Sequence, residues 1–303
     1  MDASPENILL PTEDCWSSWL NHGRDGGDAT LRARVASETT AFAEKMLSFV
    51  SAPPATMLDI GSGSGLMAWA AFSRWPELQV TMTDISPALL LQAQAEADRR
   101  GVAGQCRFVH STAETLEGTA DASQDLVTSR SVLAYVADKQ AAFRAVFRVL
   151  KPGGTMCIAE PLFRDEALSA CLLRSAQVNS ANPLTALLHK WKAAQFPDTS
   201  EAMDANPMTS YSERELFSFA RQAGFQGLHL ELHIDERQVP PRDWETFCAT
   251  SPHPLAPSLA QILASQFSTT EQETFEAAIR PCIEKGQFGT TSRMVYLHAR
   301  KPG

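Results

Sequence analysis

A glycine-rich turn is the strongest candidate for chemistry in this sequence of 303 residues. Asp59 ends an apolar run, and the next apolar stretch begins at Leu66. Glycines occupy alternate positions between them, at Gly61, Gly63 and Gly65. Glycine lets the backbone turn sharply and approach a ligand, because a side chain would obstruct both. Since the first amides of a helix have no partner within it, the pattern predicts a strand–turn–helix unit that binds a nucleotide-like ligand.

The same turn fits two classes of ligand. Read from Gly63, it satisfies the dinucleotide pattern G-x-G-x-x-G/A through Gly65 and Ala68, which alone is a weak signal. Read from Asp59, it has the form D-x-G-x-G-x-G and resembles motif I of the class I S-adenosylmethionine-dependent methyltransferases. In that family the turn, which includes Ser62 here, wraps the methionine and ribose of the cofactor, and the acid lies near the cofactor's amino-acid end. A glycine-rich loop without a ligand is the alternative.

A second acid follows at the spacing that ribose binding requires. Residues 78–83 predict a strand, and Asp84 stands at its end, 19 residues beyond Gly65. A carboxylate there can accept hydrogen bonds from both ribose hydroxyls. The resemblance also places Ile85 beside the cofactor. An aspartate that only shapes the turn is the alternative.

The next two predicted strands end in further candidate residues. Residues 106–110 lead into Ser111-Thr112-Ala113-Glu114, which resembles the family's adenine-binding segment, so Ala113 and Glu114 are expected near the adenine. A capping role for this segment is the alternative. Residues 125–129 form the following strand, and the resemblance places Ser129 and Arg130, at its end, beside the cofactor.

The order of the later elements makes the resemblance specific. A predicted helix, the residues Leu150-Lys151-Pro152-Gly153-Gly154 and a strand starting at Thr155 follow one another as in the family. Tyr135-x-x-x-Lys139 mimics a short-chain dehydrogenase pair, but it lies only 74 residues after Gly61, and those enzymes place it farther on. The implied fold is an α/β, Rossmann-like, seven-stranded methyltransferase sheet, mostly parallel with the last strand antiparallel, and with helical lid insertions.

The resemblance divides the chain into a core and added helical segments. These are an N-terminal helical lid at 1–50, an S-adenosylmethionine-binding core at 51–160, a helical substrate lid at 161–210, and the rest of the core sheet at 211–303 with a helical insertion at 235–291. Apolar periodicity predicts helices at 31–50, near 165–179 and near 183–196, and strands at 228–234 and 293–299. Thr270 and Glu273 predict a capped helix start in the last insertion.

Arg24 is a candidate for binding the cofactor's carboxylate. It lies in the loop Gly23-Arg24-Asp25-Gly26-Gly27, after Trp16 and Trp19, and this segment could close over the cofactor. A guanidinium fork matches the two oxygens of a carboxylate. A solvated loop arginine is an equally simple interpretation.

Residues that could act on a substrate are harder to assign. Tyr135 and His189 are the candidates for catalysis, although His189 could equally be a structural histidine. His229 and His233 share one face of a predicted strand, but without a third ligand nearby they do not predict a metal site.

Composition limits the partners. The 26 basic and 35 acidic residues give a net charge of −9 without a basic block, which argues against nucleic acid and favours a small neutral or cationic substrate. Six cysteines without a C-x-x-C pair indicate a reducing compartment. We find neither a signal-peptide pattern nor a membrane-spanning run, so the expected location is cytoplasmic, and a homodimer is left open.

The sequence therefore predicts methyl transfer from S-adenosyl-L-methionine to a small metabolite, with S-adenosyl-L-homocysteine as the product. The chain is similar to small-molecule, type 11-like bacterial methyltransferases, with secondary metabolism as one setting. The methyl acceptor's oxygen, nitrogen or carbon atom is not defined. Two alternatives are a non-catalytic S-adenosylmethionine-binding regulator and, less favoured, an NAD-dependent oxidoreductase.

Overall fold

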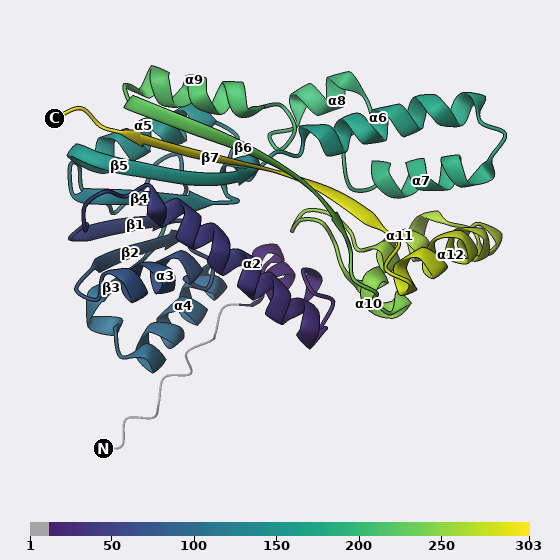
Figure 1. The fold of residues 1–303 in the computed structure, drawn as a ribbon, viewed down its shortest axis with the longest axis horizontal. Helices are drawn as coiled ribbons and strands as arrows, with labels where there is room; N and C mark the ends of the chain where they lie inside the picture. The colour runs from purple at the N-terminus through teal and green to yellow at the C-terminus, as the bar shows by residue number, and fades with distance from the viewer. Residues whose placement is uncertain (1–11) are drawn as a thin grey trace, which may run out of the picture.

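A computed structural model describes residues 12–303 as a three-layer α/β core with helical additions at one end (Figure 1). Its seven-stranded sheet has the order β3-β2-β1-β4-β5-β7-β6. Neighbouring strands pair in parallel from β3 to β5, whereas β7 is antiparallel to both β5 and β6. The predicted sheet is confirmed. The strands are β1 Thr56–Ile60, β2 Gln79–Asp84, β3 Cys106–His110, β4 Gln124–Arg130, β5 Leu150–Pro161, β6 Gln226–Gln238 and β7 Gly289–Arg300.

Helices cover both faces of the sheet because successive strand residues point to opposite sides. Met57 packs in the core beneath α2, α3 and α4, whereas Leu58 and Ile60 pack in the core beneath α5 and α9. The core helices are α2 Ala29–Ser48, α3 Leu66–Arg74, α4 Pro87–Arg100, α5 Lys139–Val149 and α9 Glu213–Ala223, with short 3-10 turns at Ala103–Gln105 (η2) and Leu133–Tyr135 (η3).

Local signals fix several helix ends. Ser86 Oγ accepts a hydrogen bond from the Leu89 amide at the start of α4, and Gly101 ends that helix in the left-handed conformation. A capping box of Ser212 and Glu215 begins α9, which ends at Gly224.

Three predicted boundaries are wrong. β5 begins at Leu150 instead of Thr155, because the 150–154 segment continues the strand through a register shift against β4. β6 and β7 are longer than predicted and pair far beyond the core, so the last insertion spans 239–288. The capping box of α12 consists of Ser268 and Glu271, and not of Thr270 and Glu273.

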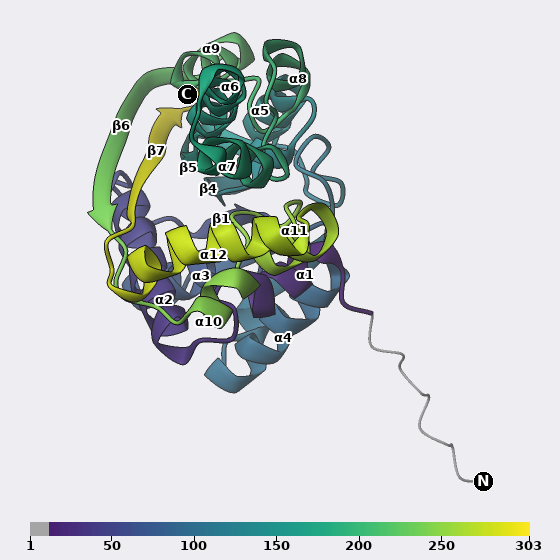
Figure 2. The ribbon, with the colours of Figure 1, turned by 90° about the vertical axis from the view of Figure 1, so that its right-hand side faces the viewer.

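The helical additions pack on one another. Figure 1 shows α6–α8 and α10–α12 at the end of the sheet to which β6 and β7 extend, and in Figure 2 this end faces the viewer. They share a core in which Leu187 of α7 is buried together with residues from the last insertion, including Trp244, Ile262 and Phe275. The helices are α1 Cys15–Ser18, the π-helical η1 Trp19–Gly23, α6 Arg164–Asn179, α7 Pro183–Ala193, α8 Ser200–Ala205, α10 Trp244–Ala249, α11 Leu259–Gln266 and α12 Thr269–Glu284. Within residues 12–303, no helix combines the length and apolar character needed to cross a membrane.

Candidate functional site

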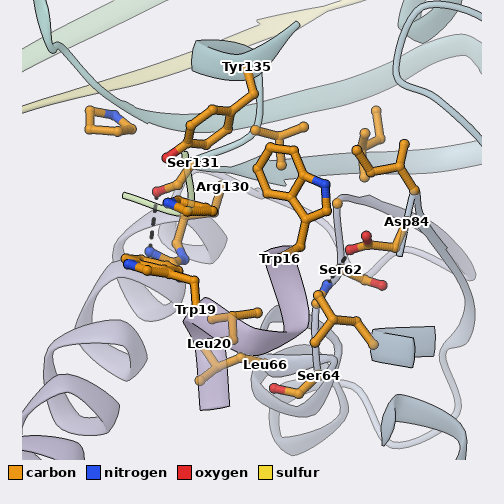
Figure 3. A pocket seen from close by; sticks show the side chains of 18 of the residues that line it. Trp16, Trp19, Leu20, Ser62, Ser64, Leu66, Asp84, Arg130, Ser131 and Tyr135 are labelled. Atoms are coloured by element: carbon orange, nitrogen blue, oxygen red, sulfur yellow. Dashed lines mark hydrogen bonds between the residues drawn. The ribbon is translucent and has the colours of Figure 1, made fainter. Parts of the chain in front are cut away.

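A cavity of about 580 Å³ lies at the carboxyl ends of the parallel strands, where ligands of open α/β sheets bind (Figure 3). Its sheet side consists of the glycine turn, the end of β2 and the segment after β3. Its other side consists of η1, α2 and residues from both later insertions. The cavity thus joins segments from the whole chain.

The glycine turn adopts backbone conformations that side chains disfavour. Gly61, Gly63 and Gly65 have φ angles of +61°, +54° and +86°. A Cβ atom on Gly61 would lie only 2.2 Å from Cγ2 of Val132, and one on Gly65 would lie 2.5 Å from the Trp69 ring. Gly61, Ser62 and Gly63 line the cavity, while Gly65 begins α3 behind it.

Asp84 connects the end of β2 to this turn. Its Oδ2 accepts a hydrogen bond from the Gly63 amide at 2.8 Å (Figure 3). Its Oδ1 accepts one from the Ser86 amide, also at 2.8 Å. Burial raises the pKa of this carboxyl group. Each oxygen can accept a further bond from a ligand. Beside it, Ile85 lines the cavity and is 44% exposed.

The segment after β3 reaches the same cavity. Ser111, Thr112, Ala113 and Glu114 all line it, as the sequence predicts for an adenine-binding segment. The Ser111 amide donates to the carbonyl of Asp84 at 3.2 Å, which joins this segment to the end of β2.

Asp59 and Ser129 lie behind the cavity wall. Asp59 is buried, its Oδ1 accepts a hydrogen bond from Thr128 Oγ1 at 2.8 Å, and its Oδ2 has no partner among residues 12–303. Burial raises the pKa of Asp59 to about 7. The Ser129 hydroxyl is also buried without a partner in this part of the chain. Neither side chain lines the cavity, although the sequence predicts both residues beside the cofactor.

A strained loop follows β4. Arg130 lines the cavity, and Ser131 has a φ of +56°, which is unusual for a residue with a side chain. The fully buried Glu160 holds this loop by accepting hydrogen bonds from the amides of Val132 at 3.0 Å and Ala134 at 3.3 Å. Burial raises the pKa of Glu160 to about 7. We did not predict a role for Glu160, although an acid between Ala159 and Pro161 in an apolar strand is a usable signal.

The N-terminal segment forms part of the cavity wall. Arg24 lines the cavity, and its Nε is buried without a hydrogen-bond partner among residues 12–303. Trp19 Nε1 donates to the carbonyl of Ser251 at 3.1 Å, and the Ser251 amide donates to the carbonyl of Gly23 at 2.9 Å. These bonds attach the segment around Arg24 to the last insertion. Trp16 packs edge-on against Tyr135 at a ring distance of 5.0 Å.

The two candidate catalytic residues differ in position. Tyr135 lines the cavity, and burial together with Glu160 raises the pKa of its hydroxyl, so it is a poor base near neutral pH. His189 on α7 does not line the cavity; its Nε2 lies 2.9 Å from Oδ2 of Asp198. A contact with Asp198 within the lid therefore accounts for His189.

The other patterns considered in the sequence have structural contacts. Lys139 is buried, and its Nζ donates to the carbonyls of Val136 and Pro207. It does not line the cavity, where the lysine of a dehydrogenase pair would act. His229 and His233 both contact Glu231 on β6. No group of three or more potential ligands in the described part of the chain is arranged to hold a metal ion.

Comparisons with known proteins agree with this geometry. Residues 58–158 match a family model described as a methyltransferase domain. The ubiquinone/menaquinone biosynthesis C-methyltransferase UbiE of Pseudomonas putida is 42% identical over 106 residues, which are 34% of this chain and 41% of that protein. UbiE of Serratia proteamaculans is 37% identical over the same length. The chain thus spans about two fifths of these relatives.

Solved structures show the same fold at low sequence identity. YcgJ from Bacillus subtilis has a TM-score of 0.54 and 18% identity over 88% of this chain and 99% of that one. Phosphoethanolamine N-methyltransferase 2 from Haemonchus contortus, solved with S-adenosyl-L-methionine, has a TM-score of 0.51 and 17% identity over 95% of this chain and 56% of that one. The matched domain, the UbiE relatives and the seven-stranded sheet thus support a class I S-adenosylmethionine-dependent methyltransferase, as the sequence predicts.

Proposed function

We propose that this protein transfers a methyl group from S-adenosyl-L-methionine to a small molecule. The observation that carries the proposal is the position of Asp84, which faces the cavity from the end of β2 while it holds the Gly63 amide of the glycine turn. A carboxylate in this place can bind the two ribose hydroxyls of a nucleoside ligand.

The residues around the cavity fit the parts of this cofactor. Gly61, Ser62 and Gly63 would contact its methionine and ribose, while Ile85, Ala113 and Glu114 would surround its adenine. The buried Nε of Arg24, which has no protein acceptor within residues 12–303, fits the cofactor's carboxylate. The backbone at Ser129 and Arg130, with the buried Asp59 and Gly65, would support the methionine end.

The chain's task in such a reaction is mainly alignment and exclusion of water. The bound cofactor supplies an electrophilic methyl group on a sulfonium sulfur, and the product is S-adenosyl-L-homocysteine. The aromatic side chains of Trp16, Trp19 and Tyr135 enclose the cavity, so an acceptor held there is kept close to the cofactor in a dry site. Tyr135 keeps a proposed role in orienting the acceptor. His189 has none, because it faces Asp198.

Calorimetric titration with S-adenosyl-L-methionine, S-adenosyl-L-homocysteine and NAD tests the proposal. We expect both sulfur compounds to bind and NAD not to bind. Binding of NAD alone would favour the oxidoreductase alternative. A screen of metabolite extracts with methyl-labelled cofactor would then separate a methyltransferase, which labels a product, from a regulator, which only binds. The cytoplasmic location and the homodimer stay predictions.

A further inference from the structure

The cavity contains two arginines that no carboxylate neutralises by direct contact. Arg24 and Arg130 both line it, and within residues 12–303 neither lies in an ion pair. Arg24 Nε has no hydrogen-bond partner in this range. Arg130 makes one long contact, from Nη1 to the Ser131 hydroxyl at 3.4 Å (Figure 3). Such guanidinium groups are free to bind anions.

Two of the nearby acids have other partners. Asp25, next to Arg24 in sequence, instead accepts two hydrogen bonds from Arg32, at 2.8 and 3.2 Å. Glu160 accepts hydrogen bonds from the amides of the loop after β4. Burial, followed by the charge of Arg24, lowers the pKa of Arg130. The two cations therefore disfavour each other, and an anion bound between them would relieve this repulsion.

The proposed cofactor supplies one carboxylate, for which Arg24 is the proposed partner. That assignment leaves the guanidinium of Arg130 available, while the backbone of Arg130 supports the cofactor from the end of β4. We propose that the side chain of Arg130 binds an anionic group of the methyl acceptor. This inference rests on the proposed function and names the class of acceptor.

The apolar part of the cavity wall indicates the chemistry of the rest of the methyl acceptor. Opposite the glycine turn, the cavity is lined by apolar and aromatic side chains: Trp19, Val35, Phe42, Phe163, Pro252 and Pro254. Flat apolar walls of this kind favour a ring system. The acceptor is accordingly a small acid with an apolar, ring-containing body. The net charge of −9 favours a neutral or cationic substrate, but it describes the whole chain. The cavity lining contains the acids Glu38, Asp84 and Glu114 beside Arg24 and Arg130, and the proposed anion site is the part of the wall at Arg130.

Two naphthalene compounds test this inference on the full chain saturated with S-adenosyl-L-homocysteine. One is 2-naphthoate, and the other is 2-naphthylmethanol, a neutral molecule of similar shape. We expect calorimetry in a buffer without carboxylate or phosphate to show at least tenfold tighter binding of the acid. Arg130→Gln should remove this preference, while the variant still binds S-adenosyl-L-homocysteine.

Two further variants serve as controls. Arg34→Gln removes an arginine of α2 whose Nε has no hydrogen-bond partner among residues 12–303 and lies 3.9 Å from Oε1 of Glu38. Because Arg34 does not line the cavity, the preference should persist. Arg130→Lys keeps the charge and loses the fork, so part of the preference should persist even if the glutamine variant does not fold.

Three results would overturn the inference: equal binding of both compounds to the unmodified protein, binding of neither, or loss of S-adenosyl-L-homocysteine binding in a folded Arg130→Gln variant. The last result would assign the guanidinium to the cofactor. Failure of the unmodified protein to bind S-adenosyl-L-homocysteine at all would instead refute the proposed function.

Discussion

The two sides of the cavity are built on different principles. On the sheet side, short contiguous segments supply the wall, and backbone groups in fixed conformations do much of the positioning, as in the bond between the Gly63 amide and Asp84. On the lid side, single residues far apart in sequence meet, as Trp19 and Ser251 do across 232 positions. Apolar side chains dominate there. The sheet side is therefore suited to a ligand that stays the same. On the lid side, substitution of single side chains can change which ligand binds.

The largest expected effect is on the sheet side. Gly61→Ala forces a side chain into a left-handed position, which costs about 1–2 kcal/mol, and pushes Val132 in the cavity wall, which adds about 1–3 kcal/mol. Because Val132 lines the cavity, the affinity for S-adenosyl-L-homocysteine should fall about a hundredfold. Calorimetry and urea unfolding measure the two effects.

Gly101→Ala is the matched control for this substitution. Gly101 has a φ of +71°, and nothing lies within 4 Å of the position of an added Cβ. The control should therefore lose about 1–2 kcal/mol of stability and keep its affinity. Equal behaviour of the two variants would show that the close approach of Gly61 to Val132 has no function.

Glu160 holds the loop after β4, and the ionisation of its buried carboxyl group should change the free energy of unfolding. Its folded pKa is raised from 4.5 to about 7, so its contribution is fully present below about pH 4.5 and is lost as the pH rises to about 7. The loss is on the order of 3 kcal/mol. Urea unfolding at pH 5 and pH 7.5 should show a clearly smaller decrease for Glu160→Gln than for the unmodified protein.

Burial also raises the pKa of Asp59 to about 7. The free energy of unfolding of the Glu160→Gln variant should therefore still decrease somewhat between pH 5 and pH 7.5. Asp59→Asn is therefore the companion variant. In the double variant, the free energy of unfolding should depend least on pH. Identical pH dependence in all four proteins would mean that neither acid resists ionisation in the folded state.

The Asp84 carboxylate should dominate cofactor affinity among single side chains. Hydrogen bonds to a charged group contribute about 1.5–3 kcal/mol each, so Asp84→Ala should weaken S-adenosyl-L-homocysteine binding at least tenfold in calorimetry. Asp98→Ala, at an exposed position of α4, should leave the affinity unchanged. A folded Asp84→Ala variant with full affinity would reduce Asp84 to a residue that shapes the turn.

The same contrast explains how much could be predicted from the sequence. The glycine turn, the strand ending at Asp84 and the segment at 111–114 depend on local conformation, and their positions followed from spacing. The mostly parallel sheet with its antiparallel last strand and the helical insertions followed from the family resemblance, whereas the strand order was not predicted. The ends of β6 and β7 did not, because their polar outer parts pair beyond the core, where no apolar alternation marks a strand.

The lid side could not be predicted in this way because its contacts are not local. His253 is 2% exposed and its Nε2 lies 3.0 Å from the carbonyl of Gln195, so the last insertion is fixed to the preceding one by a residue without a local signal. His189 shows the reverse problem. Its place on a helix face suggested a substrate contact, and only the fold brings Asp198 to its ring.

The smallest expected effect tests whether the lid side is held closed by its long-range bonds. Trp19→Phe keeps an aromatic ring in the wall and removes the hydrogen bond to Ser251, which is worth about 0.5–1.5 kcal/mol. Because this bond joins two lid segments over the cavity, its loss should speed the dissociation of S-adenosyl-L-homocysteine about two- to tenfold and barely change association. Stopped-flow fluorescence measures both rates. Trp16→Phe is the matched control, since Trp16 also lines the cavity but its Nε1 donates no hydrogen bond to any residue in the range 12–303. If Trp16→Phe speeds dissociation as much as Trp19→Phe does, the size of the ring, and not the bond to Ser251, retains the ligand.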